Sequence, residues 1–285
     1  MKQSLWLNVV LLVAVVAAGA FVFLRSPADA PVEYAVSRIT PAAAAALRIE
    51  RSGARTVVAE KRNGTWFLTA PFDARADEFM IQRILAILQA RTIHRFASTD
   101  LARFDLEKPR ARLVIDGQSF DFGMVSELSR EQYVLTADAV YALSPRYGLA
   151  LPLRPDALAS RQLFAPDEKP VRISPPGFTV ARSGQSWAVE PAHTDWSQDE
   201  LKRWADAWRA ASALRIEPYR DGEASESVRI VLNNGKELVI GVLSRKPEFA
   251  LLRPDQNLQY YFAEEVGDRL LSAPGTKRTN STDKH

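Results

Sequence analysis

The chain has 285 residues, and its 37 Lys and Arg against 34 Asp and Glu give a formal net charge of +3. Hydrophobic residues make up 47% and charged residues 25%, an ordinary globular composition that excludes a wholly disordered chain. The absence of cysteine excludes a disulfide scaffold, a thiol nucleophile and a cysteine zinc site. Nucleic-acid binding needs a stripe of basic residues, and the basic residues here are interleaved with acidic ones, so the sequence does not predict it.

An uncharged, apolar run from Leu5 to Leu24 opens the chain. As a helix it would span roughly 30 Å, the hydrocarbon thickness of a bilayer. We therefore expect residues 1–30 to form a cytoplasmic stub, a transmembrane signal anchor and a linker. The protein would then be a single-pass protein of the inner membrane, with Lys2 in the cytoplasm and most of the chain in the periplasm. The alternative is a signal peptide that is cleaved after Ala30. The expected membrane-anchor residues are Leu5, Leu12, Val16, Phe21 and Leu24.

Strand-like patterns surround one helix-like pattern in residues 31–153. Apolar and polar residues alternate over 47–51, as in a half-buried strand. Asn63-Gly64 predicts a hairpin turn before a strand that ends at Pro71. Asp77 is expected to cap a helix. The apolar face of this helix comprises Met80, Ile81, Ile84, Leu85, Ile87 and Leu88. Further strands are expected at 93–96, 113–122 and 133–143.

Residues 171–272 repeat this order. Aligning Pro71 with Pro191 brings Asp77 onto Ser197, and Ser197 forms a predicted capping box with Glu200. The same alignment pairs Ile84 with Trp204, Leu88 with Trp208, Arg83 with Arg203, and Arg95 with Arg215. A duplication of this length indicates two copies of one unit, because a solenoid needs three or more short repeats.

These patterns predict an α+β fold. It would have two tandem repeats of antiparallel β-sheet plus one long helix, preceded by a single N-terminal transmembrane helix. The expected boundaries are a first repeat at 31–153, a linker at 154–170, a second repeat at 171–272 and a disordered tail at 273–285.

The residues that could carry chemistry have structural interpretations that we favour. Asp77 and Glu78 in one copy, and Asp195, Asp199 and Glu200 in the other, fall where a helix begins, so helix capping is preferred over a glycosidase acid pair. Trp204 and Trp208 are expected in the core, and Trp196 is expected to staple the start of the helix. Arg83/Arg203 and Arg95/Arg215 recur in both copies, and a paired arginine site for an anionic ligand is an alternative; Arg83 and Arg203 are expected to flank the apolar helix face and solvate it. The three histidines, His94, His193 and His285, are isolated and predict no metal site.

Several segments of the chain resemble those of a known family. They are Trp66 to Pro71, Asp100-Leu101, Phe104 to Pro109, Phe122-Gly123, Tyr133-Val134 and Val140-Tyr141. Together they resemble the bacterial domain of unknown function 4340 (DUF4340) over roughly residues 40–265, although 219–227 lacks the Leu-x-x-Pro element of the first copy. The resemblance implies an envelope protein that is often encoded beside ABC-type transport systems, and it implies no catalytic residues.

We therefore expect a non-enzymatic, membrane-anchored envelope protein that binds a protein partner. The expected partners are subunits of an ABC-type transporter or other envelope proteins, and no cofactor, metal or nucleic acid is expected. One alternative is a periplasmic glycan or polymer binding module that uses a groove between the repeats and a ring of exposed Trp or Tyr. A less favoured alternative is a hydrolase with an unfamiliar carboxylate site.

Overall fold

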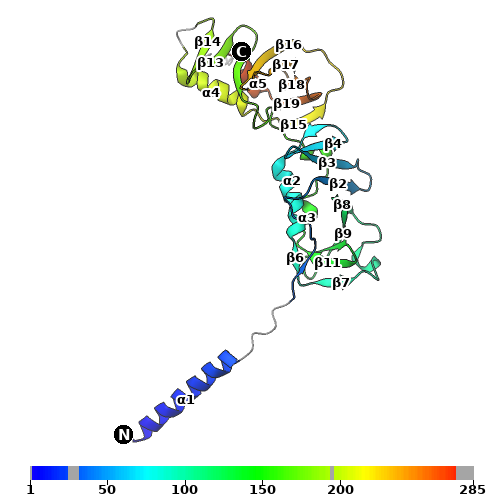
Figure 1. The fold of residues 1–285 in the computed structure, drawn as a ribbon, viewed down its shortest axis with the longest axis vertical. Coiled ribbons are helices and arrows are strands. Elements are labelled where there is room, and N and C mark those ends of the chain that lie inside the picture. The colour runs from blue at the N-terminus through cyan, green and yellow to red at the C-terminus, as the bar shows by residue number, and fades with distance from the viewer. Residues whose placement is uncertain (1, 25–31, 193–195, 274–285) are drawn as a thin grey trace, which may run out of the picture.

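The computed structural model of the protein describes residues 2–24, 32–192 and 196–273. It contains two large antiparallel sheets and one small one (Figure 1). We refer to residues 32–153 as the first unit and to residues 170–272 as the second unit. The cleavage site considered after Ala30, and the predicted tail from residue 274 onward, lie outside the described residues.

The first helix, α1 (Lys2–Leu24), contains the apolar run. Its described side chains are Trp6 and those of residues 10–21, which are exposed. Within the part of the chain that the structure describes, no helix is long and apolar enough to cross a membrane. The structure therefore does not show the transmembrane anchor that was expected at Leu5, Leu12, Val16, Phe21 and Leu24.

The first unit is built on a nine-stranded sheet with the order β5-β4-β3-β2-β8-β9-β10-β11-β7. Beside it, β1 (Tyr34–Ala35) pairs with β6 (Arg91–Thr92). The strands of the large sheet are β2 (Ala46–Arg51), β3 (Val57–Arg62), β4 (Thr65–Ala70), β5 (Ala74–Arg75), β7 (Arg95–Ala97), β8 (Ala111–Ile115), β9 (Gln118–Val125), β10 (Gln132–Thr136) and β11 (Ala139–Leu143).

The second unit is built on an eight-stranded sheet with the order β14-β13-β12-β16-β17-β18-β19-β15. The eight strands of this sheet match, in order, the strands β4-β3-β2-β8-β9-β10-β11-β7 of the first sheet. Each strand of the second unit therefore has a counterpart in the first: β15 corresponds to β7, for example, and β17 to β9. The strands of the second sheet are β12 (Pro170–Ser174), β13 (Thr179–Ser183), β14 (Ser186–Glu190), β15 (Arg215–Pro218), β16 (Glu226–Leu232), β17 (Glu237–Ser244), β18 (Glu248–Arg253) and β19 (Leu258–Ala263).

The predicted fold class is wrong in its balance of helix and strand. The protein is mostly β-sheet, with 40% strand and 22% helix. The expected long helix of the first unit is only the eight-residue α2 (Glu78–Leu85), because the chain tightens from Ala86 into the 3₁₀ helix η1 (Ala86–Gln89). The other helices are α3 (Arg146–Leu149), α4 (Gln198–Arg209), α5 (Glu264–Leu271), η2 (Ala102–Phe104) and η3 (Pro155–Leu158).

The segment 154–169 joins the two units, which lie end to end in Figure 1. One core of buried apolar residues runs through both units and includes Leu158 and Leu163 of this segment. The guanidinium of Arg75, in the first unit, donates hydrogen bonds to the carbonyl oxygens of Gln162 and Phe164 at 2.6 and 3.0 Å. The joint between the units is therefore packed with side chains.

Candidate functional site

Two of the acidic residues singled out in the sequence, Asp77 and Glu200, take part in helix caps. The Asp77 carboxylate accepts a hydrogen bond from the backbone N–H of Met80 at 3.1 Å, at the start of α2. At the start of α4, the hydroxyl of Ser197 accepts from the N–H of Glu200, and the Glu200 carboxylate accepts from the N–H of Ser197. The second of these bonds lowers the pKa of Glu200. Both predicted caps are confirmed, and Asp195 lies outside the described residues.

The tryptophans of α4 belong to the core, as predicted. Trp204 and Trp208 are buried, and their indole N–H groups donate to the carbonyl oxygens of Ser272 and Leu270 at 3.0 and 2.9 Å. Trp196 is half-buried and packs edge-on against Phe178. These three indoles therefore offer no exposed platform on which a sugar could stack.

The repeated arginines Arg95 and Arg215 lie in separate sheets, each directly opposite a tyrosine of the neighbouring strand. Arg95 pairs in register with Tyr141, and Arg215 with Tyr261, whose ring centroid lies 3.5 Å from the guanidinium carbon. Arg215 also forms an ion pair with Glu248 at 2.6 Å. Burial lowers the pKa of Arg215, but the hydrogen bonds to Glu248 and Tyr261 raise it by more. The structure therefore does not bring Arg95 and Arg215 together as an anion site.

The other predicted features also fail to assemble a reactive site. Arg83 and Arg203 are exposed, as expected. The Nδ1 atom of His94 lies 2.9 Å from the Glu131 carboxylate, whereas His193 and His285 are outside the described residues. Among the residues whose placement is described, no three His, Cys, Asp or Glu side chains could share a metal ion.

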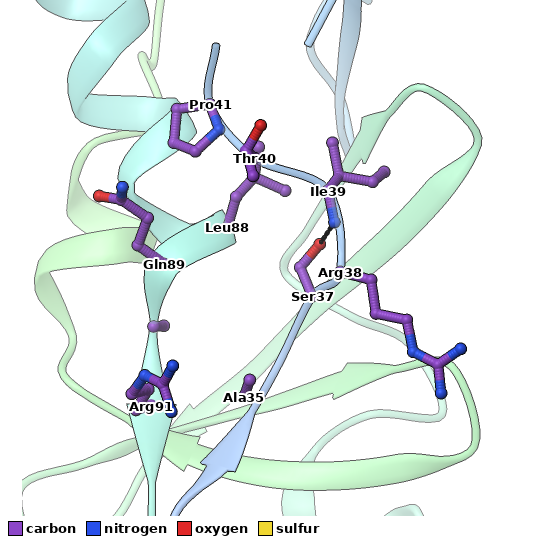
Figure 2. A pocket seen from close by; sticks show the side chains of 10 residues that line it. Ala35, Ser37, Arg38, Ile39, Thr40, Pro41, Leu88, Gln89 and Arg91 are labelled. Atoms are coloured by element: carbon purple, nitrogen blue, oxygen red, sulfur yellow. Dashed lines mark hydrogen bonds between the residues drawn. The ribbon is translucent and has the colours of Figure 1, made fainter. Parts of the chain in front are cut away.

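A pocket of ≈ 320 Å³ opens where two paired segments of the first unit diverge. Residue 35 and residues 37–41 form one wall and residues 88–91 the other, with the Leu88 side chain extending toward Thr40 (Figure 2). Arg38 extends away from Gln89 (Figure 2). The Ser37 hydroxyl accepts from the N–H of Ile39 and donates to Gln118, so it is used within the fold. The lining contains no acid and no histidine, and the volume is near the lower limit for a ligand site.

A buried charge cluster, which the sequence did not single out, lies at the joint. The fully buried Arg253 guanidinium forms ion pairs with Glu168 at 2.8 Å and Asp255 at 2.7 Å, and it donates to the Leu163 carbonyl oxygen. Burial lowers the pKa of Arg253, but these carboxylates raise it by more. The only sequence signal was a charged residue at the end of an apolar strand. Each charge in the cluster has a partner, and the cluster connects Leu163 and Glu168 of the joining segment to β18.

Exposed apolar side chains were also missed. Outside α1, ten large ones are exposed among the described residues, and eight of these lie in the first unit. Two occupy positions where the duplicate is charged. Phe79 in α2 corresponds to Asp199 in α4, and Leu149 in α3 corresponds to Arg269 in α5. The duplicated sequence held this signal, and a comparison of the exposed positions of the two copies would have revealed it.

Comparison with known proteins agrees with the resemblance drawn from the sequence. The family model described as "Domain of unknown function (DUF4340)" matches residues 66–230, from β4 of the first unit to β16 of the second. No curated protein and no solved structure matches the chain. Because the family match spans the joint and more than half of the 285 residues, the chain belongs to the DUF4340 family.

Proposed function

We propose that this chain is a non-enzymatic envelope protein that binds a protein partner through its first unit, as an accessory of an ABC-type transport complex. The transport role rests on what the resemblance to the family implies. The binding role is supported by the surface of the first unit, where most of the exposed apolar side chains lie.

The observation that carries the binding role is Phe79. Phe79 is 70% exposed in the first turn of α2, and the guanidinium carbon of Arg83 lies 5.9 Å from the centroid of its ring. The counterpart in α4 is Asp199, an acid of the kind that the helix dipole favours in a first turn. An exposed aromatic ring contributes little to its own helix, whereas aromatic and arginine side chains are the commonest anchors of protein interfaces.

The experiment places a photo-crosslinking amino acid at position 79 in the full-length chain, expressed in its own cells. The same amino acid at position 199 is the matched control, because it occupies the equivalent turn of the duplicate helix. We expect a protein adduct from position 79 that is absent from position 199, and mass spectrometry should identify it as a transporter subunit.

A second arm uses Phe79→Asp, which gives α2 the residue type that α4 already has. We expect this variant to remain folded and to lose co-purification of the subunit found by crosslinking. Equal adducts from positions 79 and 199, or full retention by Phe79→Asp, would contradict binding through this face. An adduct that is no transport component would contradict the transport role alone.

A further inference from the structure

The loop between β9 and β10, residues 126–131, presents a leucine to solvent. Leu128 is 98% exposed, and the chain around it is polar. A leucine that is exposed this fully contributes almost nothing to an apolar core. The core of the first unit does not use this side chain, so its role lies outside the fold.

The loop is held in one shape by its own backbone. The N–H of Ser126 donates to the Glu131 carbonyl oxygen at 2.7 Å, and the N–H of Arg130 donates to the Ser126 carbonyl oxygen at 3.0 Å. Arg130 has a φ of 59°, which closes the turn. The Glu131 side chain is tied to His94 on the segment that precedes β7. Leu128 is thus presented by a pre-formed loop, which lowers the entropic cost of binding.

Further apolar side chains gather at the same end of the sheet. Ile93 precedes His94, the partner of Glu131, and Val125 pairs across the strands with Gln132. The backbone of α3 packs closely against the side chain of Gln132 at Gly148. The next residue, Leu149, is 79% exposed. We call Ile93, Val125, Leu128 and Leu149, all of them exposed, the apolar end of the first unit.

The matching end of the second unit is charged. Its β17–β18 connection carries Arg245 and Lys246, which form ion pairs with Glu226 at 2.6 Å and Glu264 at 2.8 Å. Arg269 stands where the first unit has Leu149. The same architecture is therefore compatible with a hydrophilic surface here, so the fold itself does not require the apolar end of the first unit.

The charges beside Leu128 indicate what covers it. Glu127 and Arg130 flank it, both are exposed, and neither forms a side-chain ion pair with any residue that the structure describes. One free acid and one free base beside an apolar centre are self-complementary across a twofold axis.

We propose that the apolar end of the first unit binds a second copy of this chain. Two copies pack about a twofold axis at Leu128, and Glu127 of each copy faces Arg130 of the other. This contact lies on a different element from Phe79, so it adds self-association to the partner binding proposed above and does not depend on it.

The chain has no cysteine, so a single introduced thiol reports proximity cleanly. In the full-length protein, Ser129→Cys places a thiol on the loop tip beside Leu128. Ser183→Cys, on the exposed β13–β14 hairpin of the second unit, is the control. Under mild oxidation we expect a disulfide-linked dimer from Ser129→Cys and little from Ser183→Cys.

Charge reversal then tests whether the bound partner is a second copy of the chain. Added to Ser129→Cys, either Glu127→Arg or Arg130→Glu places like charges opposite each other and should reduce the dimer at least tenfold. The two reversals together restore opposite charges and should restore the dimer. Equal crosslinking of the two cysteine variants, a Ser129→Cys adduct made only with another protein, or no rescue by the double reversal would overturn the proposal.

Discussion

Gly123, on β9, is a position where a single methyl group should be costly. The loop that contains η2 crosses directly over it, and a Cβ here would overlap the Phe104 carbonyl oxygen and crowd the Leu106 side chain. This glycine belongs to the Phe122-Gly123 segment that the family resemblance relied on. A glycine is needed at this position because the backbone at Phe104 approaches the backbone of β9 closely.

We expect Gly123→Ala to lower the free energy of unfolding by about 2–3 kcal/mol, since overpacking a tight site forces backbone shifts. The counterpart Gly241→Ala is the control. Its nearest neighbour is the Ala224 side chain at 2.8 Å from the Cβ position, so we expect a smaller loss there. Urea unfolding of both variants measures the difference, and an equal or reversed order would contradict the close approach over Gly123.

The charge cluster around Arg253 predicts how stability depends on pH. Burial raises the pKa of Glu168 and of Asp255, but their hydrogen bonds and the positive charges of Arg253 and Lys236 together lower each pKa by more, so each lies below its usual value of 4.5 or 3.8. A carboxyl group whose folded pKa is depressed contributes stability above its unfolded pKa. That stability is lost as pH falls through the folded value. The protein should therefore lose stability on acidification below about pH 4.5.

Arg253→Met should destabilise the protein by about 3–5 kcal/mol near neutral pH, because it removes the ion-pair partner of the Glu168 carboxylate and leaves Asp255 with Lys236 alone. Its deficit relative to the wild type should shrink at about pH 3, because the wild type is then losing the stability that the depressed pKa values of Glu168 and Asp255 supply. Chemical unfolding at the two pH values tests this. A deficit that does not change with pH would mean that packing, and not charge, is what Arg253 supplies.

At the scale of elements, β14 is an edge strand that one side chain protects. Gln198, the first residue of α4, accepts from the backbone N–H of Trp187 at 3.0 Å and donates to its carbonyl oxygen at 2.8 Å. Its amide thus pairs with the outer edge of β14 as a neighbouring strand would. Unpaired edges are templates for association between chains.

We expect Gln198→Ala to increase aggregation on mild heating, measured by light scattering, while the free energy of unfolding falls by no more than about 1 kcal/mol. Lys202→Ala, on the exposed face of the same helix, is the matched control and should leave aggregation unchanged. Identical scattering from the two variants would show that Gln198 does not protect the edge.

The elements that the sequence predicted correctly are those with local signals. Asp77 and Ser197 are caps, and Asn63-Gly64 adopts the positive φ angles of a hairpin turn. The overall class was missed because strands of two residues, such as β1, β5 and β6, are too short to show a periodic pattern. The burial of Arg253 and the exposure of Leu128 depend on contacts between distant segments, which composition and spacing do not encode.

At the scale of the whole molecule, the joining segment is bound from both sides. Arg75, from the first unit, donates to the Ser160 hydroxyl and to the carbonyl oxygens of Gln162 and Phe164. Arg253, from the second unit, donates to the carbonyl oxygen of Leu163 between them. With a core that continues through the joint, the two units should unfold together.

Calorimetry of the wild-type chain should therefore show one cooperative transition. Arg75→Met removes the side-chain hydrogen bonds from Arg75 to the segment but leaves the backbone hydrogen bonds between residues 75–77 and 158–160 and the bond from Arg253. We expect the transition to broaden or split in two. Arg48→Met, on the exposed side of β2, is the control and should keep a single transition. Two separate transitions in the wild type would contradict the coupling, since each unit would then unfold as an independent body. A single sharp transition in Arg75→Met would instead place the coupling in the apolar core around Leu158 and Leu163.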